Sequence, residues 1–141
     1  MKKREKGKLR VLHVIALMNV GGTAVYLSNL ILGLEKLGIE NLLVVGTVPK
    51  GEVESSLVEK LPIKRVNSLS REIILSKDLA ARREIKEIIK NFKPDIIHSH
   101  TFKAGLLIRS IKCEFPIVHS FHGHHLYDPE FGLDRKSTRL N

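Results

Sequence analysis

Short apolar runs alternate along the chain with segments of helical periodicity. Residues 9–17 (LRVLHVIAL) and 41–46 (NLLVVG) are almost continuously apolar, as is typical of parallel strands buried on both faces. Shorter runs predict further strands at 63–66, 95–99 and 116–121. The pattern therefore predicts five strands.

Helices are predicted between these runs. We expect a short helix within 51–60, with Val53 facing inward. Asp78 is expected to cap the helix that Pro94 ends, and Thr101 is expected to cap the last helix. The predicted inner faces of the three longer helices are Leu27, Leu30, Ile31, Leu34 and Leu37; Ile85, Ile88, Ile89 and Phe92; and Ala104, Leu107, Ile108 and Ile111.

Strands and helices that alternate in this way predict an α/β fold. Right-handed crossovers then give a Rossmann-like parallel sheet with helices on both faces, and we expect the strand order 3-2-1-4-5. Ligands of such sheets bind beyond the carboxyl ends of the strands, where the order reverses. The three loops expected there carry the most unusual sequences of the chain, at 19–23, 98–103 and 119–125.

The first of these loops contains Gly21 and Gly22, followed by Thr23. Two glycines between a strand and a helix let the backbone approach a ligand and leave helix amides available for an anion such as a diphosphate. The spacing is neither that of a dinucleotide-binding loop nor that of a P-loop. A tight turn without a ligand remains the alternative.

The other two loops are rich in histidine, and six of the seven histidines lie between residues 98 and 125. A zinc cluster is one hypothesis, but strand geometry argues against convergence of all six, so no metal site is predicted. His98 and His119 are expected to be hydrogen-bonded within the core. His100 and His122 stand at strand ends and are expected to contact a phosphate or sugar hydroxyl or to exchange a proton. Lys103 either reaches an anion or is a solvated surface lysine.

Composition narrows the class of protein. No apolar run reaches the length of a membrane span and the amino terminus does not fit a signal peptide, so we expect a cytoplasmic protein. The net charge is +9, and residues 1–8 form a basic tail that is either a solubilising leader or an attachment to anionic lipid at the inner face of the membrane. No aromatic platform interleaves with the basic residues, so nucleic acid is not an expected partner.

The last eight residues, 134–141 (DRKSTRLN), resemble the translation of a common sequencing adapter. We therefore expect the native sequence to stop near Leu133, with a truncated Rossmann-like domain at 9–133.

Two motifs, PDIIHSHTFKAG at 94–105 and PIVHSFHGH at 116–124, resemble those of family 4 glycosyltransferases of the GT-B fold, and HVIALMNVGG at 13–22 fits the same family. The family includes bacterial enzymes of surface polysaccharide biosynthesis. The resemblance covers about residues 9–132. It implies a retaining, metal-independent transfer of a sugar from a nucleotide donor, with UDP or GDP, to a glycan or lipid-linked acceptor, and no cofactor.

The resemblance also implies roles for individual residues. His122 matches the histidine at the reacting centre, and the glycine loop matches the one that approaches the donor diphosphate. His100 and Lys103 match positions that line the same cleft. The neighbouring positions predicted to bind substrate are Gly21, Gly22, Thr23, Thr101, Gly123 and His124. Side chains around Tyr26 and Phe102 are expected to contact the acceptor.

The nucleotide-binding half of the family is not present in these 141 residues, so the chain is expected to be inactive alone. Three alternatives remain: a GT-B sugar-nucleotide 2-epimerase, a non-catalytic module that binds a glycan or nucleotide, and a metal-dependent hydrolase.

Overall fold

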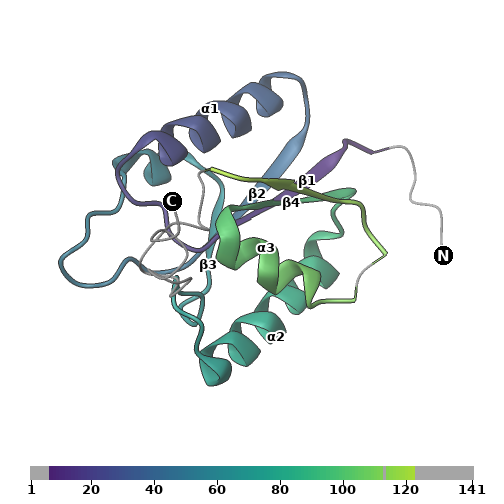
Figure 1. Cartoon of the computed structure of the whole chain (residues 1–141). Helices are drawn as coiled ribbons and strands as arrows, with labels where there is room; N and C mark the ends of the chain where they lie inside the picture. Colours follow the sequence, from purple (N-terminus) through teal and green to yellow (C-terminus); the bar gives the residue numbers. More distant parts are fainter. Residues whose placement is uncertain (1–6, 113, 123–141) are drawn as a thin grey trace, which may run out of the picture.

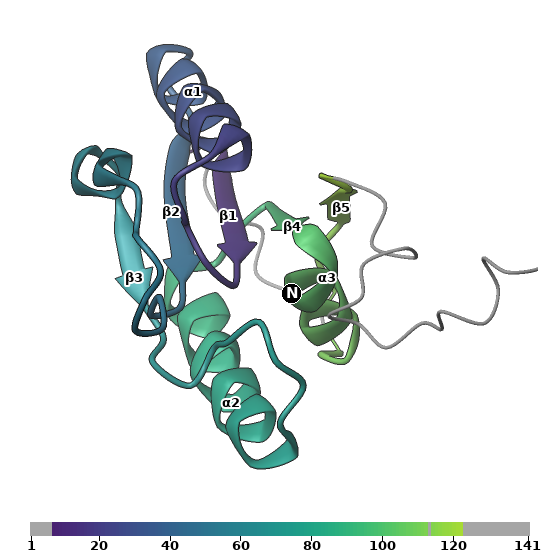
Figure 2. The same ribbon diagram turned by 60° about the vertical axis from the view of Figure 1, so that its left-hand side comes forward.

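The computed structural model describes residues 7–112 and 114–122, and its strands form one five-stranded parallel sheet. The strand order is β3-β2-β1-β4-β5, so the predicted α/β class and order 3-2-1-4-5 are confirmed. Figure 2 shows the five strands in this order from left to right. Most of the basic tail, residues 123–133 and the adapter-like segment 134–141 lie outside the described residues.

The element boundaries agree with the apolar pattern to within a few residues. The strands are β1 (Arg10–Ile15), β2 (Glu40–Val45), β3 (Ile63–Arg65), β4 (Ile96–His100) and β5 (Ile117–Ser120). The helices are α1 (Gly22–Lys36), α2 (Leu75–Phe92) and α3 (Thr101–Arg109), with one 3-10 turn, η1 (Ser56–Lys60). None of the helices in the described residues is long and apolar enough to cross a membrane.

Helices cover the two faces of the sheet unequally, as Figure 1 shows, with α1 on one side and α2 and α3 on the other. The face toward α2 and α3, here the α2/α3 face, holds the larger apolar cluster. Its strand residues are Leu12, Val14, Val44 and Ile97, and its helix residues are Ala81, Ile85, Ile88, Ile89, Ala104, Leu107 and Ile108. Ala16 directly after β1 and Ile111 after α3 belong to the same cluster. The opposite face, here the α1 face, packs Ile15, Leu43 and Val45 against Ala24, Leu27 and Ile31 of α1 and against Val58 and Leu61.

Four local predictions were wrong. Leu37 was expected on the inner face of the first helix, but α1 ends at Lys36 and Leu37 is 76% exposed. Asp78 does not cap α2, because the helix begins at Leu75 and Asp78 lies within its first turn. Thr101 is the first residue of α3 rather than its cap, and it has a positive φ of 66°. Val53 is 69% exposed, since the short helix begins only at Ser56, after the Ser55 hydroxyl accepts a hydrogen bond from the Leu57 amide.

Candidate functional site

The loops singled out in the sequence follow β1, β4 and β5, which are neighbours in the sheet. Parallel strands place their carboxyl ends at one edge, so these loops share that edge. Gly21 is the N-cap of α1, and its φ of 154° lies in the region that favours glycine. Gly22 and Thr23 begin the helix, whose first turn receives no hydrogen bond from a capping side chain and contains no acidic residue. The local geometry suits an anion at the start of α1.

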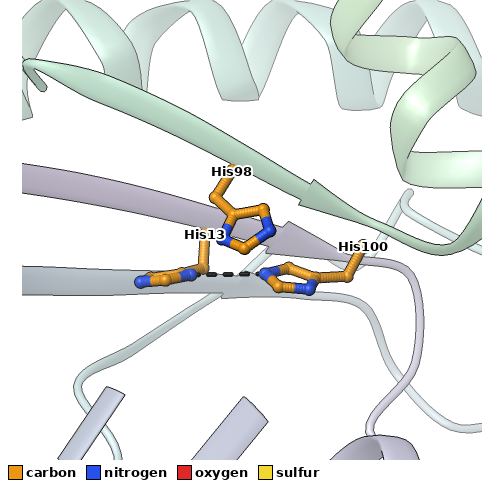
Figure 3. A group of neighbouring side chains, drawn as sticks. All are labelled: His13, His98 and His100. Atoms are coloured by element: carbon orange, nitrogen blue, oxygen red, sulfur yellow. Dashed lines mark hydrogen bonds between the residues drawn. The ribbon is translucent and has the colours of Figure 1, made fainter. Parts of the chain in front are cut away.

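Four histidines gather where β1, β4 and β5 end. His13 and His98 are partners in the register of β1 and β4, and His100 follows two residues later on the same face as His98. Figure 3 shows the three imidazoles directed toward one another, with His98 above the other two. The ring centroids of His98 and His100 are 3.9 Å apart, and that of His122 lies 5.4 Å from His100.

A chain of polar contacts runs through three of these histidines. Asn41 Nδ2 donates to the Ile39 carbonyl, so its Oδ1 is directed at His13 Nε2, 3.0 Å away. His13 Nδ1 is 3.3 Å from His100 Nε2, and His100 Nδ1 is 3.2 Å from His122 Nε2. Because Asn41 Oδ1 can only accept, His13 carries its proton on Nε2 when neutral, and its Nδ1 is an acceptor.

The buried imidazoles of this cluster are held in the neutral form. Burial lowers the pKa of His13, against the opposing effect of its hydrogen bond to Asn41. Burial, followed by repulsion from neighbouring imidazoles, lowers the pKa of His98 to about 4 and that of His100 to about 2. At neutral pH His13, His98 and His100 therefore offer ring nitrogens as neutral donors and acceptors rather than positive charges.

Helix α1 contributes an aromatic side chain to the same place. The Tyr26 ring lies edge-on to His122, with centroids 5.1 Å apart, and 6.5 Å from His100. Tyr26 is 46% exposed, so the helix that begins at the glycine loop also presents an accessible ring beside the histidines.

Lys103 has a different environment from the histidines. It is only 3% exposed, so it is not a solvated surface lysine. Its ammonium group forms an ion pair with Asp78 Oδ1 at 2.5 Å and donates to the Glu72 carbonyl. The anion that Lys103 binds in this structure is therefore a carboxylate of α2. Its predicted contact with substrate stays a prediction.

The structure thus brings together His100 and His122, as expected from the sequence, and adds His13 and His98 to them. His13 was missed, although a histidine inside an otherwise apolar strand was a visible signal. His119 lies on the α2/α3 face, where its Nδ1 is 2.8 Å from Ser99 Oγ, so it does not join the cluster. Gly123 and His124 lie outside the described residues.

A sequence comparison decides the family. The model of the family described as Glycosyltransferase Family 4 matches residues 20–140. The chain belongs to glycosyltransferase family 4. No curated protein matches the chain.

Solved structures share the fold at low sequence identity. A sucrose-phosphate synthase from Thermosynechococcus elongatus superimposes with a TM-score of 0.67 and 14% identity over 95% of the chain. A glycosyltransferase from Rickettsia africae ESF-5 superimposes with a TM-score of 0.65 and 20% identity over 88% of the chain. A UDP-GlcNAc 2-epimerase from Neisseria meningitidis bound to UDP-GlcNAc superimposes with a TM-score of 0.55 and 18% identity over 93% of the chain. The family 4 chain covers 37%, 32% and 37% of these proteins, so it spans about a third of their length.

Proposed function

We propose that this chain is the acceptor-side domain of a retaining glycosyltransferase that moves a sugar from a nucleotide donor to a hydroxyl of a glycan or lipid-linked acceptor. The observation that carries the proposal is the meeting of His100 and His122 at the carboxyl edge of the sheet that also bears the glycine loop, in a chain of family 4. Fold and family agree with this assignment. The retention of configuration rests on the family resemblance.

In this proposal His122 contacts the reacting groups. Its Nε2 is hydrogen-bonded to Nδ1 of the buried His100, and its ring packs edge-on against the accessible ring of Tyr26. A neutral imidazole at that position hydrogen-bonds a sugar hydroxyl or takes up a proton near neutral pH. His100 is fully buried, so it acts as a positioning residue that orients His122.

The amides at the start of α1 are proposed to approach the diphosphate of a UDP- or GDP-linked sugar. Gly21 and Gly22 have no atoms within 4 Å of the position that a Cβ would occupy, so a ligand can approach their backbone. The positive end of the helix favours an anion there. No cofactor is part of the proposed reaction. The basic amino-terminal tail is proposed to attract anionic lipid, which would bring a cytoplasmic enzyme to a lipid-linked acceptor.

The decisive experiment uses a protein in which this chain is joined to a nucleotide-binding domain. Purified protein is incubated with UDP- and GDP-sugars and a mixture of glycan and lipid-linked acceptors, and the product is identified by mass spectrometry, with NMR for its anomeric configuration. His122→Ala is expected to lower kcat by about 10²–10⁴-fold. His119→Ala is the matched control and should retain most activity, because His119 lies in β5 on the α2/α3 face, away from His122. Full activity of His122→Ala would contradict the proposal.

The epimerase remains a second candidate, since the Neisseria meningitidis protein with the same fold is a 2-epimerase. It would convert a nucleotide sugar into an isomer of equal mass without an acceptor, whereas a transferase leaves the nucleotide sugar intact or hydrolyses it slowly. Chromatography of the nucleotide sugars after incubation without acceptor separates these reactions. The 141-residue chain alone is expected to show neither, and turnover by it would overturn its assignment as one domain of two.

A further inference from the structure

We propose that His13, His98 and His100 form a binding site for a divalent transition-metal ion of the zinc class. Each of the three side chains offers a ring nitrogen, and these atoms lie within 4.8 Å of one another. Three histidines are a ligand set that zinc sites use, with the fourth position left to water or another group. The argument for metal binding does not rest on the proposed transferase reaction.

The separation of the ring nitrogens of His13 and His100 fits a tetrahedral ion. Two nitrogens at a zinc–nitrogen distance of about 2.0–2.1 Å and a tetrahedral angle lie roughly 3.3–3.4 Å apart. His13 Nδ1 and His100 Nε2 are 3.3 Å apart in their hydrogen bond, which is already the separation of two nitrogens bound to one tetrahedral ion. An ion that binds both atoms therefore requires little movement of the two buried rings.

The strands explain how three ligands reach one point. His13 and His98 are paired across β1 and β4, and His98 and His100 alternate onto the same face of β4. His13 and His100 are fully buried, whereas His98 is partly exposed and gives the ion a path from solvent. The set contains no carboxylate, so it favours zinc, copper or nickel over magnesium or calcium.

Each proposed ligand has a hydrogen-bonding partner for its other ring nitrogen. Asn41 Oδ1 is 3.0 Å from His13 Nε2, and Ser120 Oγ is 2.7 Å from His98 Nε2. His122 Nε2 lies 3.2 Å from His100 Nδ1. Such partners fix the tautomer and the ring orientation of metal-binding histidines. The hydrogen-bonding partners that orient the three histidines are thus already in place.

Metal binding has a consequence for His122, which does rest on the proposed function. Without metal, His100 Nε2 donates to His13 Nδ1, so His100 Nδ1 accepts from His122 Nε2–H. With metal on Nε2, His100 carries its proton on Nδ1 and donates to His122 Nε2. The ion therefore moves the proton of neutral His122 from Nε2 to Nδ1 and couples metal occupancy to the proposed reacting centre.

The test is metal binding by the purified chain after removal of metal with a chelator. Cobalt(II) is titrated first, because a tetrahedral cobalt site absorbs visible light, and zinc is then measured by competition with a chromophoric chelator. We expect one ion per chain. Ser120→Ala, which removes the hydrogen-bonding partner of His98 Nε2, should weaken binding by roughly 10–100-fold. His98→Ala, which removes a ligand, should weaken it by more. His119→Ala is the matched control and should bind as the wild type does.

Thermal unfolding of each variant without metal shows whether it folds, and His98 is the ligand chosen because it is only partly buried. Absence of tetrahedral cobalt absorption in the folded wild type overturns the proposal. Binding that survives His98→Ala, or that disappears in folded His119→Ala, overturns it as well. If the ion binds but His122→Ala leaves sugar transfer unchanged, the metal site stands and the transferase role of His122 fails.

Discussion

The two faces of β4 differ in the kind of side chain that they carry. On the α2/α3 face, Ile97 is completely buried in the apolar cluster, and Ser99 bonds to His119. On the α1 face, His98 and His100 stand beside His13 in a polar cluster. One strand of five residues therefore serves the core with one set of alternate positions and the candidate site with the other.

The difference follows from where the helices lie. Helices α2 and α3 pack over one face, whereas α1 packs against β2 and leaves the α1 face of β5 open, where Val118 is 47% exposed. Buried imidazoles need hydrogen-bond partners, and they find them in Asn41 and Ser120. We therefore expect side chains on the α2/α3 face to contribute mainly to the free energy of unfolding, and those on the α1 face to form the candidate site.

The largest expected effect comes from removing apolar volume from the α2/α3 face. Ile97→Ala should lower the free energy of unfolding by about 2–5 kcal/mol, because it deletes buried methylenes and leaves a cavity. The conservative control Ile97→Val should cost only about 0.5–1.5 kcal/mol. Urea denaturation measures both. If His98→Ala destabilises the protein as much as Ile97→Ala does, the α2/α3 face of β4 does not contribute more to stability than the α1 face.

The buried ion pair of Lys103 and Asp78 gives the next largest effect. Lys103→Ala leaves a carboxylate that is only 18% exposed without its cation, and we expect a loss of about 3 kcal/mol. Joint replacement by Met at 103 and Leu at 78 should recover most of that loss, since no unpaired charge then remains. A double-mutant cycle measures the coupling. Full stability of Lys103→Ala would show that the pair does not hold α2 and α3 together.

The case of Lys103 shows what the sequence could and could not predict. Apolar periodicity predicted the strands and the inner residues of α2 and α3, because burial of a strand or helix face leaves a local pattern, and the strand order followed from the rules for alternating strands and helices. The partner of Lys103 is 25 residues away, and no local pattern indicates which charges a fold brings together. Likewise the approach of His13 to His98 depends on the register of β1 against β4, which is fixed by pairing between distant segments.

Acid should weaken the α1 face selectively. His13, His98 and His100 have lowered pKa values, so the unfolded chain, with histidine pKa values near 6.5, binds protons that the native state does not. The free energy of unfolding therefore falls as pH drops below about 6.5. The loss due to His98 continues down to about pH 4, and that due to His100 down to about pH 2. From pH 7 to pH 6, His98 and His100 each contribute roughly 0.7 kcal/mol, or about 1.4 kcal/mol together, and the lowered pKa of His13 adds a loss of the same sign.

Urea unfolding at pH 7 and pH 6, with a chelator present, measures this loss. The ionisable groups near the three histidines are His122, Tyr26 and, from the other face of the sheet, His119, and all three are the same in all variants compared. His98→Gln should reduce the loss between pH 7 and pH 6 by about 0.7 kcal/mol, because one titrating group is gone. A stability that does not change between pH 7 and pH 6 would contradict neutral, buried imidazoles.

The smallest expected effects come from the same substitution in helices on opposite faces. A methyl group at Gly105 in α3 would lie 2.5 Å from His119 Cε1, so Gly105→Ala must displace that ring and its hydrogen bond to Ser99. Gly33 in α1 has no atom within 4 Å of the corresponding position. Gly33→Ala should therefore stabilise by about 0.5–1 kcal/mol through helix propensity, whereas Gly105→Ala should destabilise by about 1 kcal/mol despite the same gain. Thermal unfolding of the two variants gives opposite shifts if α3 packs closely on β5 while the middle of α1 is open to solvent. Shifts of the same sign would mean that the His119 ring can move away from the added methyl group, and that α3 does not pack closely on β5.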